Sequence, residues 1–186
     1  MHSPATALPF CYHLVMRKIT ASLILSTLLL AACSPQFNWR DYSSPDAPFR
    51  VMFPDKPATH TRSVDLDGMS VNMTMTAAQV DGTMFAVGSA EAPDAARAQA
   101  ALVAMKTAMV RNIGATITSE KTRAATAGAP AAIDIEATGS SNGAPMRLIG
   151  HFEARNKRFY QVIVMGRATA MPPDQVEMFM TSFKLL

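Results

Sequence analysis

The side chains of two methionines and one histidine are of kinds that bind soft metal ions. Met73 and Met75 are two positions apart in a stretch that alternates apolar and polar residues, so their thioethers would lie on one face of a strand. If His60 lay on a neighbouring strand, its imidazole and the two thioethers would suit Cu(I). Val71 and Ala77 continue the same apolar face, as in a strand that packs on a core. Two interpretations therefore stay open, a copper site and core packing.

Acidic residues and a second histidine could serve a hydrolase. Asp134 and Glu136 lie at i and i+2, which places them about 7 Å apart on one face of a strand. His151 lies in another segment of β-like composition. A pocket that gathered these three side chains would favour acid–base chemistry, whereas a dispersed arrangement would indicate the solvated face of a sheet.

Other catalytic and ligand-binding motifs are missing from the sequence. It contains no G-x-S-x-G nucleophile motif, no G-x-x-x-x-G-K phosphate loop and no G-x-G-x-x-G dinucleotide motif. His60 and His151 are the two histidines after residue 33, and their wide separation does not match a zinc motif. We therefore expect no cofactor.

The charge balance gives no basis for nucleic-acid binding. Two of the seventeen Lys and Arg precede residue 33, which leaves fifteen against fourteen Asp and Glu in the rest of the chain. The densest basic group is Arg155, Lys157 and Arg158, in a segment that we expect to be a hairpin turn. A solvated turn explains this group better than a phosphate site.

Cys33 stands where an apolar segment gives way to polar, proline-containing sequence. Two basic residues after Met16 are followed by an apolar stretch of twelve residues, Ile19 to Leu30, and then by small residues. That order is typical of a secretory signal, and the stretch is shorter than the roughly 20 residues that cross a bilayer. We expect residues 1–32 to be a signal peptide. Within them we expect Met16 to be the true start, so that residues 1–15 result from a mis-assigned start codon.

The sequence Leu30-Ala31-Ala32-Cys33 resembles the lipobox of bacterial lipoproteins. The resemblance implies that the Cys33 sulfur receives a diacylglyceryl group, that the peptide bond before it is cut, and that the new amino terminus is acylated. Ser34 follows in place of aspartate, which resembles lipoproteins of the Gram-negative outer membrane that face the periplasm. The alternative is an ordinary secretory signal with a chance cysteine. With Cys33 lipidated and Cys11 lost, no thiol remains for a disulfide or a nucleophile.

The residues after Cys33 divide into a tether and one domain. Residues 33–47 contain prolines and several polar residues, so we expect a lipidated tether. Trp39 and Tyr42 suggest that its second half packs on the domain. Residues 48–186 are long enough for a single domain with its own core.

Alternating apolar residues and turn dipeptides predict an antiparallel sheet. Asp67-Gly68 and Asp81-Gly82 are strong hairpin turns, and the segment 59–66 has the polar composition of an edge strand. The expected strands are 49–53, 59–66, 71–77, 83–90, 115–120, 131–137, 146–154 and 159–166, with turns at 139–143 and at Asn156-Lys157.

Two segments have helical periodicity. From Asp94 to Asn112 apolar residues recur every three or four positions, and Gly114 stands where a C-terminal capping glycine belongs. Pro172-Pro173 opens a shorter helix near residue 180. Strands, a long helix, more strands and a short helix predict an α+β fold. We expect an antiparallel β-sheet with the long middle helix and the short C-terminal helix packed on it.

The layout of residues 39–186 resembles a family of small bacterial lipoproteins. The features that carry the resemblance are Trp39 with Tyr42, PFRVMFPDKP at residues 48–57, the middle helix, Arg158-Phe159-Tyr160 in a late hairpin, and the terminal MFMTSFKLL. This layout is similar to the PsbP-like superfamily, which includes the periplasmic DcrB group. The resemblance implies an antiparallel sheet between helices and an accessory or binding role. It implies no catalytic residue.

These observations together predict a lipid-anchored, non-catalytic protein on the periplasmic face of the outer membrane. Its expected partners are the membrane, through Cys33, and an envelope protein or small ligand. Two alternatives remain, a copper-binding protein that uses Met73, Met75 and His60, and a hydrolase built on the acidic pair and the second histidine.

Overall fold

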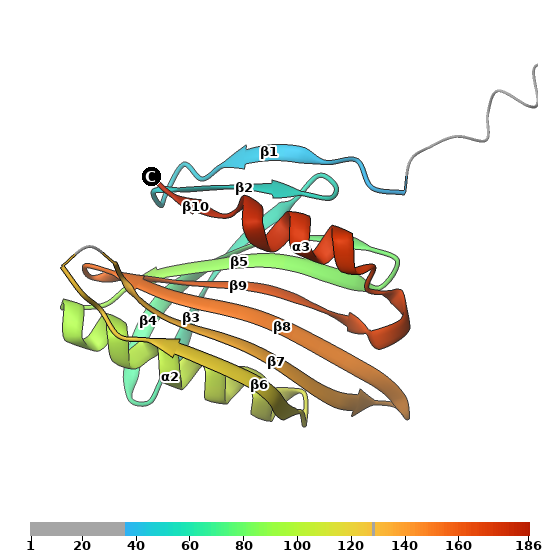
Figure 1. Ribbon diagram of the computed structural model, residues 1–186. Coiled ribbons are helices and arrows are strands. Elements are labelled where there is room, and N and C mark those ends of the chain that lie inside the picture. Colours follow the sequence, from blue (N-terminus) through green and yellow to red (C-terminus); the bar gives the residue numbers. More distant parts are fainter. Residues whose placement is uncertain (1–35, 128) are drawn as a thin grey trace, which may run out of the picture. The chain divides into compact units, whose positions relative to one another are not determined.

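The computed structural model describes residues 36–127 and 129–186. Residues Phe37–Leu186 form one compact unit, and its helices and strands are labelled in Figure 1. The unit is mixed α+β, as predicted: antiparallel strands predominate, with one long helix and one short C-terminal helix.

A seven-stranded antiparallel sheet forms the centre of the domain (Figure 1). Its strands lie in the order β3-β4-β5-β9-β8-β7-β6. Their bounds are β3 Ala58–Leu66, β4 Met69–Val80, β5 Thr83–Glu91, β6 Thr116–Arg123, β7 Ala131–Ser141, β8 Ala144–Arg155 and β9 Arg158–Arg167. Strands β3 to β5 pair in chain order, as do strands β6 to β9. The pairing of β5 with β9 joins these two groups into one sheet. β3 lies at one edge of the sheet, as its polar composition predicted.

Tight turns set the register of these hairpins. Asp67-Gly68, Asp81-Gly82 and Asn142-Gly143 all have positive φ at both residues, from 47° to 80°. Positive φ at both positions is the requirement of the two-residue turn that matches strand twist. The turn predicted over 139–143 is therefore only two residues long, and β7 and β8 both extend further toward it than expected.

The long helix α2, Ala95–Asn112, ends where its sequence signals place it. Asp94 caps its first turn, because the Asp94 carboxylate accepts a hydrogen bond from the Arg97 backbone N–H at 2.8 Å. Gly114 has φ +57° after the last turn, and its N–H donates to the Arg111 carbonyl at 3.1 Å. A left-handed residue there satisfies a carbonyl that the helix leaves open. Both predicted ends are confirmed.

The helix α2 covers one face of the sheet and closes a first hydrophobic core (Figure 1). Its buried residues are Ala98, Ala101, Leu102 and Met105. They pack on apolar residues of β4, β5, β7, β8 and β9, among them Met73, Ala86, Ile133, Ile135, Leu148, Phe152, Phe159 and Ile163. Burial of this apolar surface is the main stabilising contribution of the layer.

A second, smaller sheet and a short helix cover part of the opposite face. The small sheet has the order β1-β2-β10, with β1 Arg40–Ser43, β2 Phe49–Phe53 and β10 Lys184–Leu185. The helix α3, Pro173–Ser182, follows a 3₁₀ turn at Ala168–Ala170. Their core contains Phe49, Phe53, Phe85, Val87, Tyr160, Val162, Val164, Val176, Phe179 and Phe183. The two helices therefore lie on opposite faces of the large sheet (Figure 1).

The folded unit starts earlier than the predicted boundary at Pro48. β1 pairs with β2 along its whole length, and the Trp39 indole N–H donates to the Gln175 side chain at 3.1 Å. Tyr42 packs edge-on to Phe53, with ring centroids 5.6 Å apart. The expectation that Trp39 and Tyr42 pack on the domain is confirmed. β1 thus lies in the second half of the segment 33–47, which was expected to pack on the domain; a four-residue strand offers too few alternating positions to stand out in a sequence.

Candidate functional site

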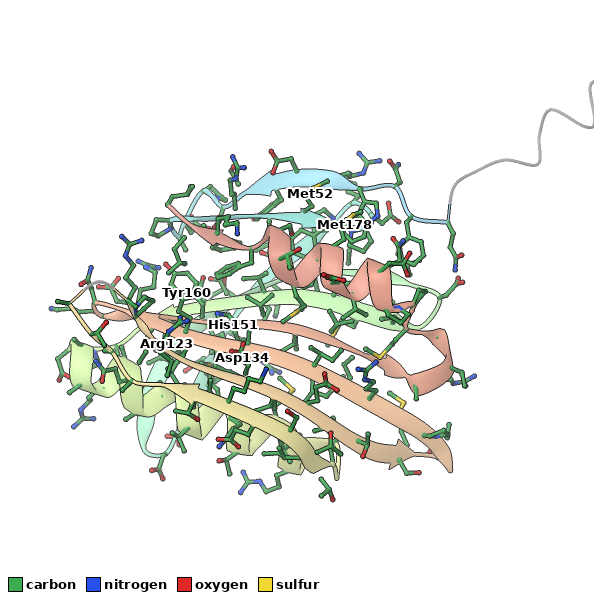
Figure 2. All side chains as sticks on the ribbon, viewed as in Figure 1. Met52, Arg123, Asp134, His151, Tyr160 and Met178 are labelled. Atoms are coloured by element: carbon green, nitrogen blue, oxygen red, sulfur yellow. The ribbon has the colours of Figure 1, made fainter. Side chains whose placement is uncertain are left out.

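Three charged side chains meet on the face of the sheet that α3 covers only in part. The His151 Nδ1 atom on β8 lies 2.6 Å from a carboxylate oxygen of Asp134 on β7. The other ring nitrogen, Nε2, lies 2.9 Å from a carboxylate oxygen of Glu153. Figure 2 shows Asp134 and His151 close together on neighbouring strands. We call Asp134, His151 and Glu153 the histidine cluster.

The hairpin register builds the histidine cluster. Asp134 stands directly opposite His151 in the pairing of β7 with β8, and paired positions point their side chains to the same face. Glu153 is two residues further along β8, so it shares that face as well. The His151 ring also lies 6.2 Å from the Phe183 ring, measured between centroids. The histidine cluster thus lies beside the layer formed by the small sheet and α3.

The carboxylates favour the charged form of the histidine. Burial of the ring lowers the pKa of His151, but the hydrogen bonds to Glu153 and Asp134 outweigh burial, and the pKa is raised above 6.5. The His151 and Glu153 side chains are 20% and 14% exposed, whereas Asp134 is 56% exposed. A protonated imidazole donates through both nitrogens, so protonated His151 donates one hydrogen bond to Asp134 and one to Glu153.

The histidine cluster differs from the hydrolase site considered above. A catalytic base needs a free ring nitrogen facing a nucleophile, and both nitrogens of His151 face carboxylates. Within residues 36–127 and 129–186 no hydroxyl group hydrogen-bonds to this ring. Glu136 bonds to Arg147 at 3.1 Å instead. Two of the three predicted residues therefore meet, Glu136 does not join them, and Glu153 was missed.

The proposed copper ligands are only partly brought together. His60 stands directly opposite Met75 in the pairing of β3 with β4, so the expected neighbouring strand is confirmed. Met73, however, is 5% exposed inside the α2 core. The Met75 sulfur accepts a hydrogen bond from the Gln161 amide at 3.1 Å. Core packing explains both methionines, and the described residues contain no group of three or more His, Cys, Asp or Glu that could hold a metal.

A cavity of about 520 Å³ opens at the end of the sheet near the turn between β8 and β9. Its charged lining comes from Arg155, Lys157 and Arg158 and from Glu91 at the end of β5. Tyr160, Pro48 and Leu185 line it as well. We call this feature the end cavity. The sequence predicts a solvated turn for the basic group, but nothing in it indicates that distant residues line a cavity beside this turn.

The residues of the predicted anchor lie outside the part that the structure describes. This holds for Cys33, for Ser34 and for the leader 1–32. Among the described residues, no helix combines the length and apolar character needed to cross a membrane. The sequence matches no model of a known protein family and no curated protein.

The histidine cluster predicts a pH-dependent stability. The folded-state pKa of His151 is raised above 6.5. The stabilisation of the fold by protonated His151 is therefore fully present below about pH 6.5 and is lost as pH rises through the folded-state pKa. Hydrogen bonds to charged groups contribute about 1.5–3 kcal/mol. We expect the unfolding free energy of the wild type to fall across that window relative to that of His151→Gln.

Urea unfolding at a series of pH values from 5.5 to 8.5 measures this difference. The matched control is His60→Gln, which removes a histidine from the exposed edge strand β3. It should keep the wild-type pH dependence. A His151→Gln protein with the same pH dependence as the wild type would show that the histidine cluster does not stabilise the fold.

Proposed function

We propose that the protein is a lipid-anchored binding protein of the outer membrane that faces the periplasm and acts without catalysis. Its anchor is a diacylglyceryl group on Cys33. Its partner is an envelope protein or a small ligand held by the domain Phe37–Leu186. The observation that carries the proposal is the order of residues 16–34, in which a basic start, a short apolar stretch and Leu30-Ala31-Ala32-Cys33 follow one another.

The start of the folded unit supports an anchoring role. Four peptide bonds separate Cys33 from Phe37, so a fully extended chain spans at most about 14 Å between them. Phe37 itself packs edge-on to Phe85, with ring centroids 6.5 Å apart. A lipid on Cys33 would therefore keep this end of the domain close to the bilayer.

The geometry of the domain supports binding over catalysis. The titratable residues that meet, Asp134, His151 and Glu153, contact one another and leave no ring nitrogen free. The end cavity combines charged and apolar walls, which is the usual character of a ligand pocket. The resemblance to the PsbP-like superfamily belongs to the same proposal. It implies a sheet between helices, and α2 and α3 lie on opposite faces of the sheet.

Substitution of Ser34, the residue after Cys33, tests the proposed location in the outer membrane. In Gram-negative sorting, aspartate at that position favours the inner membrane. We expect Ser34→Asp to move most of the lipidated protein from outer-membrane to inner-membrane fractions in a sucrose density gradient. Ser34→Ala, which adds no charge, should stay with the wild type in the outer-membrane fractions. A Ser34→Asp protein that still sediments with the outer membrane would contradict the proposed route.

A further inference from the structure

The end cavity contains an arrangement of like charges that costs stability. Arg155 and Arg158 stand directly opposite each other in the pairing of β8 with β9. Like charges at directly opposed positions destabilise a sheet. Lys157, in the turn between them, adds a third cation. A bound anion would relieve this repulsion.

Among the described residues, one of these three cations, Arg158, has a charged partner. The Arg158 guanidinium bonds to the Glu91 carboxylate at 2.9 Å and to the Asp46 backbone carbonyl at 3.4 Å. These contacts fix its position. In the described part of the chain, Arg155 and Lys157 form no ion pair. The side chains of the lining thus include three cations and one carboxylate, that of Glu91, and Leu186 adds the α-carboxylate of the last residue.

A buried tyrosine lines the same cavity. Tyr160 is 1% exposed, and no residue of 36–127 or 129–186 forms a hydrogen bond with its hydroxyl. Every described side-chain nitrogen or oxygen that is fully shielded from solvent has a partner. The Tyr160 oxygen is therefore not fully shielded, and Tyr160 lines the end cavity. Burial raises the pKa of Tyr160, Arg158 and Arg155 lower it, and Glu153 raises it, so two cations and one carboxylate act on the hydroxyl.

We propose that the end cavity binds a phosphate monoester or carboxylate that carries an apolar group. Arg155 and Lys157 would pair with the anionic oxygens, and the Tyr160 hydroxyl would donate to one of them. Pro48 and Leu185 would pack on the apolar group. A volume of about 520 Å³ suits a small organic ligand, since such pockets are usually about 300–1,000 Å³.

The end cavity lies away from the start of the folded unit. Phe37 packs on Phe85 near the beginning of β5, whereas Glu91 ends that strand. Glu91 lies six residue steps along the strand from Phe85, which corresponds to about 20 Å. The inference deepens the proposed binding function by naming the ligand class. It does not depend on the lipid at Cys33.

Calorimetric titration of the purified full chain in a nonionic detergent tests the proposal. The probes are phenyl phosphate, inorganic phosphate and phenol, with dihexanoyl phosphatidic acid as a water-soluble lipid. We expect saturable binding of phenyl phosphate, at least tenfold tighter than that of inorganic phosphate or phenol. Tighter binding of the short-chain lipid than of phenyl phosphate would identify a lipid head group as the ligand. The reverse order would identify a soluble phosphomonoester.

Variants of the lining locate the binding. Arg155→Gln combined with Lys157→Gln should weaken phenyl phosphate binding at least tenfold. Tyr160→Phe, which keeps the buried ring, should weaken it about three- to tenfold. Arg62→Gln, at an exposed position of β3, removes one positive charge away from the cavity and should bind as the wild type does.

Three results would overturn the proposal. They are no saturable binding by the wild type, wild-type affinity in the double variant, and equal affinity for inorganic phosphate and phenyl phosphate. An unmodified Cys33 would remove the proposed anchoring and leave these binding results unchanged. The two proposals can therefore fail separately.

Discussion

Replacing Cys33 by serine should abolish incorporation of a lipid label and remove the protein from outer-membrane fractions. A serine hydroxyl cannot supply the thioether sulfur to which the diacylglyceryl group is attached. Each buried methylene of an acyl chain contributes about 0.8 kcal/mol, so losing two or three chains removes nearly all of the membrane affinity. Labelling with a radioactive fatty acid, followed by fractionation and immunoblotting, measures both effects. The expected residual label is at background level.

The second cysteine of the sequence provides the matched control. Cys11 precedes Met16, the residue that we expect to be the true start. Cys11→Ser should therefore keep full labelling and the wild-type location. Labelling of Cys33→Ser at the wild-type level would mean that the lipid is attached elsewhere.

Replacing Phe85 by alanine should destabilise the domain by about 3–5 kcal/mol. The Phe85 ring is fully buried and contacts the rings of Phe37, Trp39 and Phe179, with centroid distances of 6.5, 6.4 and 5.4 Å. Truncation would leave a void where the N-terminal segment, α3 and the large sheet meet. Because domains are stable by only about 5–15 kcal/mol, this is a large share of the total. Urea unfolding followed by circular dichroism measures it.

An apolar residue on the surface controls for the loss of side-chain atoms. Val103 on α2 is 54% exposed, and Val103→Ala should change the unfolding free energy by no more than about 0.5 kcal/mol. A Phe85→Ala protein within about 1 kcal/mol of the wild type would show that this ring does not join the layers.

Most of the large sheet could be predicted because its signals are local. The Asp-Gly turns at residues 67 and 81 require positive φ at both positions, and the structure has it there. The alternation from Val71 to Ala77 and the cap residues of α2 are equally local. The small sheet was not predicted, since β10 has only two residues. So short a strand leaves no periodic pattern.

The pairing of Asp134 with His151 in the histidine cluster could have been predicted from the sequence. Residues equally far from a two-residue turn stand opposite each other in a hairpin. Counting outward from Asn142-Gly143 pairs Asp134 with His151, as observed. Glu136 was expected in the cluster in place of Glu153 because the turn was assigned five residues, 139–143, which leaves the register undefined. The end cavity was not predictable in this way. Pro48, Glu91 and Leu185 reach it from three separate elements.

Mass spectrometry of the intact protein from its native host tests the central claim most directly. The account predicts a mature chain that begins at residue 33, with a diacylglyceryl thioether on the cysteine sulfur and an acylated amino terminus. A chain that carries a free thiol at Cys33, or that is still joined to the leader, would contradict it.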